Sequence, residues 1–123
     1  MKADSRIAAD KLFFEGGFGE PLSEGISQDM RVCLETVRWA PSAVNKQPWR
    51  VVITDTGIHF YEHHDKGYIH PNGIDLQKVD LGIAICHFDL ALEEKNMAHE
   101  IVIDDPGLEI PSDVEYISTF KMI

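Results

Sequence analysis

The chain has 123 residues, a mass of 13.9 kDa, 44% apolar residues and a formal net charge of −10. This length predicts one domain over residues 1–123, or part of one, and the apolar content is typical of a globular core. The acidic balance argues against a nucleic-acid partner, because such binding depends on neutralisation of phosphates by Lys and Arg.

No apolar run approaches the roughly 20 residues needed to span a bilayer, so no membrane association is expected. The first six residues contain no apolar signal region, which predicts a cytoplasmic protein. Cys33 and Cys86 each lie in an amphipathic helical pattern. We expect both to be small buried apolar residues and not a disulfide or a metal pair.

The N-terminal part predicts two helices joined by a glycine-rich connector over residues 16–21. The first helix is expected over residues 5–15, ended by Gly16-Gly17. The second begins after Ser27, its N-cap, and ends before Pro41. Within this second helix, apolar residues recur at i, i+3, i+4 and i+7 and form one stripe: Met30, Cys33, Leu34 and Val37.

Residues 38–50 are the most unusual stretch, because they hold both tryptophans, two prolines, a Ser, an Asn and a Gln. The segment from position 31 to position 50 contains four basic residues and a single acidic residue, Glu35, although the chain as a whole is strongly acidic. A proline-braced turn with amide, hydroxyl and cationic donors suits a planar, anionic, heteroaromatic ligand. Residue chemistry alone slightly favours the alternative, a structural corner whose Trp rings fill the core.

Two β-rich runs, residues 50–54 and 58–63, are separated by Asp55-Thr56-Gly57, which predicts a hairpin. Residues 65–75 are expected to form a surface loop. A short strand is expected over residues 100–104, followed by a turn over residues 104–107. Residues 114–123 predict a terminal strand or an extended arm.

A third helix is expected over residues 76–95, with two apolar stripes on different faces. One stripe is Leu76, Val79, Ile83, Cys86 and Leu90, and the other is Leu81, Ile85, Phe88 and Leu92. A helix that is apolar on two faces is buried on two faces, which for so short a chain implies a partner. Gly82 in mid-helix suggests the close approach of another backbone.

The sequence gives little support to metal binding or to nucleophilic catalysis. Six histidines suggest a metal, but no Cys or carboxylate completes a ligand set in the sequence, so no metal site is predicted. Ser42 lacks a Gly-x-Ser-x-Gly elbow, and His87 has no suitably placed nucleophile, so no catalytic side chain is predicted.

The run Ala40-Pro41-Ser42-Ala43-x-Asn45-x-Gln47-Pro48-Trp49-Arg50, followed by Val51-Val52-Ile53, resembles the flavin-contacting segment of the FMN-dependent nitroreductase family. The likeness continues through Phe13-Phe14, His59-Phe60-Tyr61, the run from Asp80 to Phe88, and Glu115-Tyr116-Ile117. It is strongest to the C-terminal half of a subgroup in which one long chain holds two nitroreductase-like halves. The resemblance implies an α+β nitroreductase-like fold, or one half of it, with a buried central helix and a small antiparallel sheet.

The resemblance also implies a site and a reaction. The cofactor-binding residues would be Pro41, Ser42 and Ala43 along the flavin ring or phosphate, Asn45 as a hydrogen-bond partner, and Gln47 and Arg50 as supports of the loop and the phosphate side. FMN would carry hydride from NAD(P)H to a nitro or quinone-like aromatic acceptor, so the protein need supply no acid–base residue.

One family element is missing: an Arg-Arg-Ser-like phosphate-binding run, for which Asp4-Ser5-Arg6 is a poor substitute. We therefore expect a half-site that is completed by a second copy of the chain or by a missing N-terminal half. The alternative hypothesis is a non-catalytic module that has lost flavin and serves only as an interface.

Overall fold

A computed structural model describes residues 6–42, 46–64 and 76–123 of the chain. Five strands form one sheet in the order β1-β2-β3-β5-β4. The β1–β2 pair is parallel, and the other neighbouring pairs are antiparallel. The strands are β1 (Phe13–Glu15), β2 (Trp49–Thr54), β3 (Gly57–His63), β4 (His99–Val102) and β5 (Val114–Met122); the helices are η1 (Ala9–Lys11), α1 (Gln28–Arg38) and α2 (Leu76–Glu94). This composition confirms the predicted α+β class.

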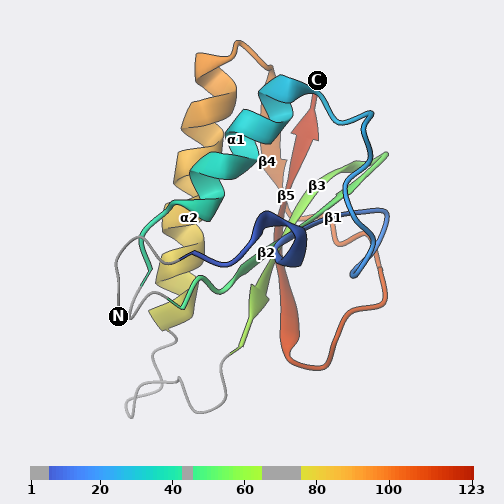
Figure 1. The fold of residues 1–123 in the computed structure, drawn as a ribbon, viewed down its shortest axis with the longest axis vertical. Helices are drawn as coiled ribbons and strands as arrows, with labels where there is room; N and C mark the ends of the chain where they lie inside the picture. The colour runs from blue at the N-terminus through green and yellow to red at the C-terminus, as the bar shows by residue number, and fades with distance from the viewer. Residues whose placement is uncertain (1–5, 43–45, 65–75) are drawn as a thin grey trace.

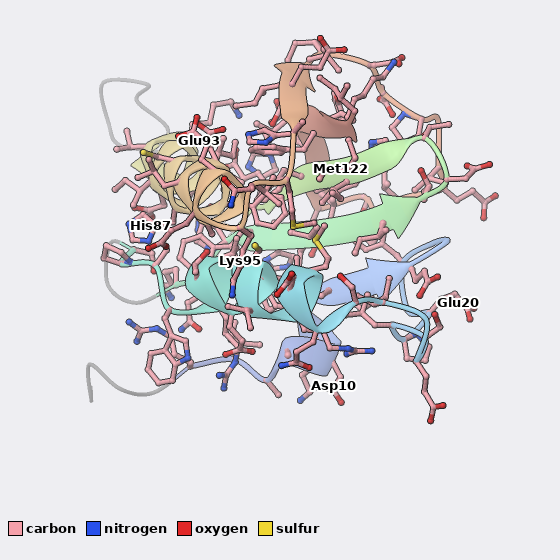
Figure 2. The ribbon with its side chains drawn as sticks, turned by 90° about the horizontal axis from the view of Figure 1, so that it is seen from above. Asp10, Glu20, His87, Glu93, Lys95 and Met122 are labelled. Carbon is pink, nitrogen blue, oxygen red and sulfur yellow. The ribbon has the colours of Figure 1, made fainter. Side chains whose placement is uncertain are left out.

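Both α1 and α2 lie on the same side of the sheet, which Figure 1 shows from the front and Figure 2 from above. The core between the helices and the sheet contains three phenylalanine rings in mutual contact. The ring centroids of Phe60 and Phe88 are 5.4 Å apart, and those of Phe88 and Phe120 are 4.9 Å apart. Burial of these aromatic side chains, with the aliphatic residues of the same core, holds α2 on the sheet.

The opposite face of the sheet carries a smaller apolar cluster. Phe14, Val52, Tyr61 and Val114 are buried there, because alternate residues of a strand point to opposite faces. Phe18 packs over them from the connector after β1, with its ring centroid 5.0 Å from that of Tyr61. The residues of that connector therefore cover part of the second face.

Helix α1 matches its prediction closely. The Ser27 side chain accepts a hydrogen bond from the Met30 amide at 3.1 Å, as an N-cap should. All four residues of the predicted stripe, Met30, Cys33, Leu34 and Val37, are buried.

The predicted helix over residues 5–15 is wrong. Phe13 and Phe14 belong to strand β1, in register with Val51 and Val52 of β2. Each ring is buried on a different face of the sheet, which no helix could achieve for adjacent residues. The strand ends at Gly16, whose amide donates to the Ile53 carbonyl at 2.8 Å and whose φ of +85° favours glycine.

The β2–β3 hairpin is confirmed. Gly57 is required at its turn, because a Cβ there would lie 2.8 Å from the Phe120 carbonyl oxygen of neighbouring β5. Of the two forms proposed for residues 114–123, the terminal strand is correct. The loop expected over residues 65–75 lies outside the described residues.

Helix α2 is confirmed, but within this chain only one of its stripes is buried. Leu81, Phe88 and Leu92 face the core, whereas Val79 and Leu90 are each 57% exposed. The expected burial of Cys86 is wrong, because this side chain is exposed on the same outer face; Cys33 is buried as expected. No described atom lies within 4 Å of a Cβ built at Gly82, so the close approach expected there does not come from this part of the chain.

In the part of the chain that the structure describes, we find no helix with both the length and the apolar character needed to cross a membrane.

Candidate functional site

The candidate loop starts where α1 ends. The Trp39 amide donates to the Glu35 carbonyl at 3.1 Å and the Ala40 amide to the Val37 carbonyl at 3.0 Å, which closes the last helical turn. The chain then enters Pro41 and Ser42 and returns through Lys46 to the start of β2. Packed helix and strand therefore hold both ends of the loop. Ala43 and Asn45 lie outside the described residues.

Ser42 and Gln47 brace this loop from inside. The Gln47 amide donates to Ser42 Oγ at 2.9 Å across the turn. The Gln47 side chain is 3% exposed, and its Oε1 accepts a hydrogen bond from the Ile7 amide at 2.7 Å. Its φ of +50° is uncommon for a residue other than glycine. The structure thus places Gln47 within the loop's own framework.

Arg50 supports the same turn from the strand side. Its guanidinium donates to the Gln47 carbonyl at 2.9 Å and to the Trp49 carbonyl at 2.7 Å. These two bonds keep the half-buried, positively charged side chain of Arg50 at the base of the loop.

The two tryptophans have different roles. Trp49 is fully buried, as the structural-corner interpretation expects, and its Nε1 has no hydrogen-bond partner among the described residues. Trp39 is 48% exposed. The guanidinium carbons of Arg6 and Arg38 lie 5.1 and 5.3 Å from its ring centroid, which is cation–π distance.

Arg38 also links the loop to the N-terminal segment. Its Nε donates to the Ile7 carbonyl at 2.9 Å, and its Nη1 lies 3.2 Å from Glu35 Oε2. The basic residues of positions 31–50 are therefore not gathered at one point. Arg38 contacts Trp39 together with Arg6, which lies outside that group, whereas Arg31 donates to the Ser23 carbonyl.

Three surface hollows, of about 630, 360 and 650 Å³, lie elsewhere on the molecule. None of these three is lined by a residue of the 39–50 loop. These three hollows are therefore separate from the part of the candidate loop that the structure describes.

The histidines have partners that sequence patterning did not reveal. His59 is buried between Thr54 and Thr119, with bonds of 2.8 and 2.7 Å, and burial lowers its pKa. His99 bonds to Asp89 of α2, and His64 bonds to Glu115. The last pair is 51 residues apart in sequence, so no local spacing could have indicated it. His87 is exposed on the side of α2 away from the sheet (Figure 2).

In a comparison with known protein families, residues 20–92 match the family described as "Putative TM nitroreductase". The chain belongs to this nitroreductase family. The matched range contains α1, the whole 39–50 loop and the β2–β3 hairpin, and it ends within α2. The family resemblance stated from the sequence is thereby confirmed.

Among solved structures, the chain is similar to a nitroreductase family protein from Clostridium difficile 630. The TM-score is 0.68 at 22% sequence identity, and the alignment covers 81% of this chain and 73% of that one. At this identity the match establishes a shared fold, so the predicted nitroreductase-like fold is also confirmed. A comparison with curated protein sequences gave no match.

Proposed function

We propose that this nitroreductase family chain builds one wall of an FMN site in an NAD(P)H-dependent oxidoreductase that reduces nitro or quinone-like aromatic compounds. The observation that supports this most is the braced loop at the end of α1. Its turn is closed by the Ser42–Gln47 bond and held from below by Arg50, within the segment that matches the family. Such pre-organisation lowers the entropic cost of binding a rigid ring system.

The residues present fit a flavin in their donor chemistry. Ser42 Oγ already accepts one hydrogen bond and can still donate one, and Lys46 is an exposed cation in the same loop. A hydroxyl donor and a cation are the groups that a flavin's carbonyls and phosphate require. Bound FMN would accept hydride from NAD(P)H and pass it to the acceptor.

The roles of the individual residues are carried over from the family resemblance. We assign Pro41, Ser42, Ala43 and Asn45 to contact with the flavin. Gln47 and Arg50 act on the cofactor indirectly, because they form hydrogen bonds within the loop and to the N-terminal segment.

The second wall would come from a partner, either a second copy of the chain or an N-terminal half. The outer stripe of α2, defined by Val79, Ile83, Cys86 and Leu90, is the apolar surface available for it. Val79, Cys86 and Leu90 are exposed and Ile83 is half-buried. Exposed apolar residues grouped on one face are typical of an interaction site.

The visible absorption spectrum of the purified chain, recorded alone and after FMN is added and the excess removed, tests the proposal. We expect retained flavin at a stoichiometry near one per chain or per dimer. The double variant Ser42→Ala, Asn45→Ala should retain less flavin while remaining folded by circular dichroism, although it should unfold at a lower urea concentration because the Gln47 amide loses Ser42 Oγ as its acceptor. Unchanged retention in this variant would contradict the residue assignment.

A non-catalytic interface module is the second candidate. It is favoured by the commitment of Gln47 and Arg50 to bonds within the chain and by the exposed stripe of α2. A folded protein that stays colourless after incubation with FMN, and that self-associates, would support this alternative over the enzyme.

A further inference from the structure

Away from the loop, a charged cluster joins the end of β3, the start of β5 and the first turn of α2, which lie together at the lower end of Figure 1. Its members are Glu62, His64, Glu115 and Lys78. Lys78 Nζ lies 2.9 Å from Glu62 Oε1 and 2.8 Å from Glu115 Oε1. His64 contacts both carboxylates too, with Nδ1 at 3.2 Å from Glu62 and Nε2 at 2.9 Å from Glu115.

We propose that Glu62, His64 and Glu115 form a divalent transition-metal site of the zinc type, in which the Lys78 ammonium holds the position of the metal until the ion displaces it.

The geometry of the three donors supports this assignment. One ligand atom from each residue can be chosen so that all three lie within 4.8 Å of one another. Zinc binds imidazole nitrogen and carboxylate oxygen at about 2.0–2.2 Å, shorter than the present contacts to the ammonium. Exchange of the ammonium for a smaller ion therefore draws the carboxylates inward, toward the spacing of a coordination shell.

Burial and charge favour an ion of higher charge at this position. The Glu62 side chain is fully buried, and a buried carboxylate is costly unless a cation offsets its lost hydration. A divalent ion would neutralise the two negative charges of Glu62 and Glu115, whereas the single positive charge of the Lys78 ammonium neutralises only one.

The opposite side of the cluster is open to solvent. The side chains of Lys78 and Glu115 are 48% and 45% exposed. Lys78 can therefore swing into water on its flexible stem, and the ion has an entry path. Three protein ligands would leave a position for water. The imidazole ligand favours zinc, cobalt or nickel over magnesium and calcium.

The test uses the full chain without a histidine tag, freed of metal by a chelator. Zinc binding is followed by calorimetry, and cobalt binding by visible absorption. We expect one ion per chain. His64→Gln should weaken zinc binding by about tenfold or more. Loss of a residue that only supports a metal ligand already costs about that much, and His64 is proposed as a ligand itself. Lys78→Met should bind zinc at least several-fold more tightly, because the competing ammonium is gone.

His63→Gln is the matched control. His63 is the adjacent histidine, and its Nε2 contacts Asp113 at 2.9 Å instead of the cluster. Circular dichroism verifies folding of each variant, and Lys78→Gln replaces Lys78→Met if the latter unfolds. Absence of saturable zinc binding by the wild type overturns the proposal. So does equal zinc affinity of His64→Gln and His63→Gln. Neither result depends on whether the chain binds flavin.

Discussion

Gln47 connects three parts of the chain although it is a single residue with an uncommon backbone conformation. Its amide holds Ser42, its side chain holds the Ile7 amide and its carbonyl accepts from Arg50. The resemblance assigned this position to support of the flavin site. The geometry shows that Gln47 braces the loop itself, since its side chain is buried and its amide bonds to Ser42 Oγ.

Replacement of Gln47 by Ala should destabilise the protein by about 1–3 kcal/mol, because the partly buried Ile7 amide loses its acceptor. Urea unfolding gives the change in the free energy of unfolding. Lys46→Ala, at the exposed neighbouring position, is the control and should stay within about 0.5 kcal/mol of the wild type. Equal stability of the two variants would show that Gln47 is not a brace.

At the scale of elements, the structure and the sequence agree where a pattern is local. The stripe and cap of α1, the β2–β3 turn and the extent of α2 were all predicted, because each depends on residues within a few positions of one another. Strand β1 was missed, since the two adjacent phenylalanines fit a helix end as well as a strand. Only pairing with Val51 and Val52, far along the chain, decides between these forms.

The candidate site likewise combines features that the sequence indicates with features that only the structure shows. The loop and its donors were apparent from composition and motif, whereas the bonds that organise it were not. The Ile7–Gln47 bond spans 40 residues and the Arg38–Ile7 bond spans 31, so neither leaves a periodic signal in the sequence. The Glu62–His64–Glu115 cluster escaped detection for the same reason.

The junction of α2 with the edge strand β4 depends on His99. This side chain donates from Nδ1 to the Met97 carbonyl and pairs through Nε2 with Asp89. Burial lowers its pKa, but the bonds to Asp89 and Met97, together with the charges of Asp89 and Glu93, outweigh that effect, so the pKa is raised above the ordinary 6.5.

A raised pKa in the folded state means that the protonated form stabilises the fold. This contribution is fully present below pH 6.5 and is lost as the pH rises through the higher folded-state value. The stability difference between wild type and His99→Gln should therefore be largest in mild acid and shrink in mild base. Urea unfolding at a series of pH values measures it. A difference that does not vary with pH would contradict the ionic role of His99.

At the scale of the whole molecule, the chain exposes an apolar helix face that its own sheet does not cover. Val79 and Leu90 lie on that face, whereas the opposite side of α2 is packed in the core. The described part of this chain therefore buries only one of the two apolar stripes that the sequence shows. The remaining stripe is the surface through which we propose that a partner completes the site.

Leu90→Lys should reduce self-association without loss of the fold, because this side chain is 57% exposed and makes little contact with the core. Light scattering coupled to size-exclusion chromatography reports the mass in solution. Ile110→Lys is the control, since Ile110 is also exposed but lies in the segment between β4 and β5. A wild-type chain that is monomeric at all concentrations would contradict the homodimer and favour the N-terminal half as the partner.

The bonds of Ile7 bear on the order in which the protein folds. The hairpin and the two helices can form from near neighbours, but the site loop is set only when the N-terminal segment reaches Gln47 and Arg38. Contacts of such sequence separation carry a large loop-closure cost and are made late. The candidate loop therefore gains these bonds only with the other long-range contacts of the fold, such as the pairing of β1 with β2 and of β3 with β5, and after the local elements.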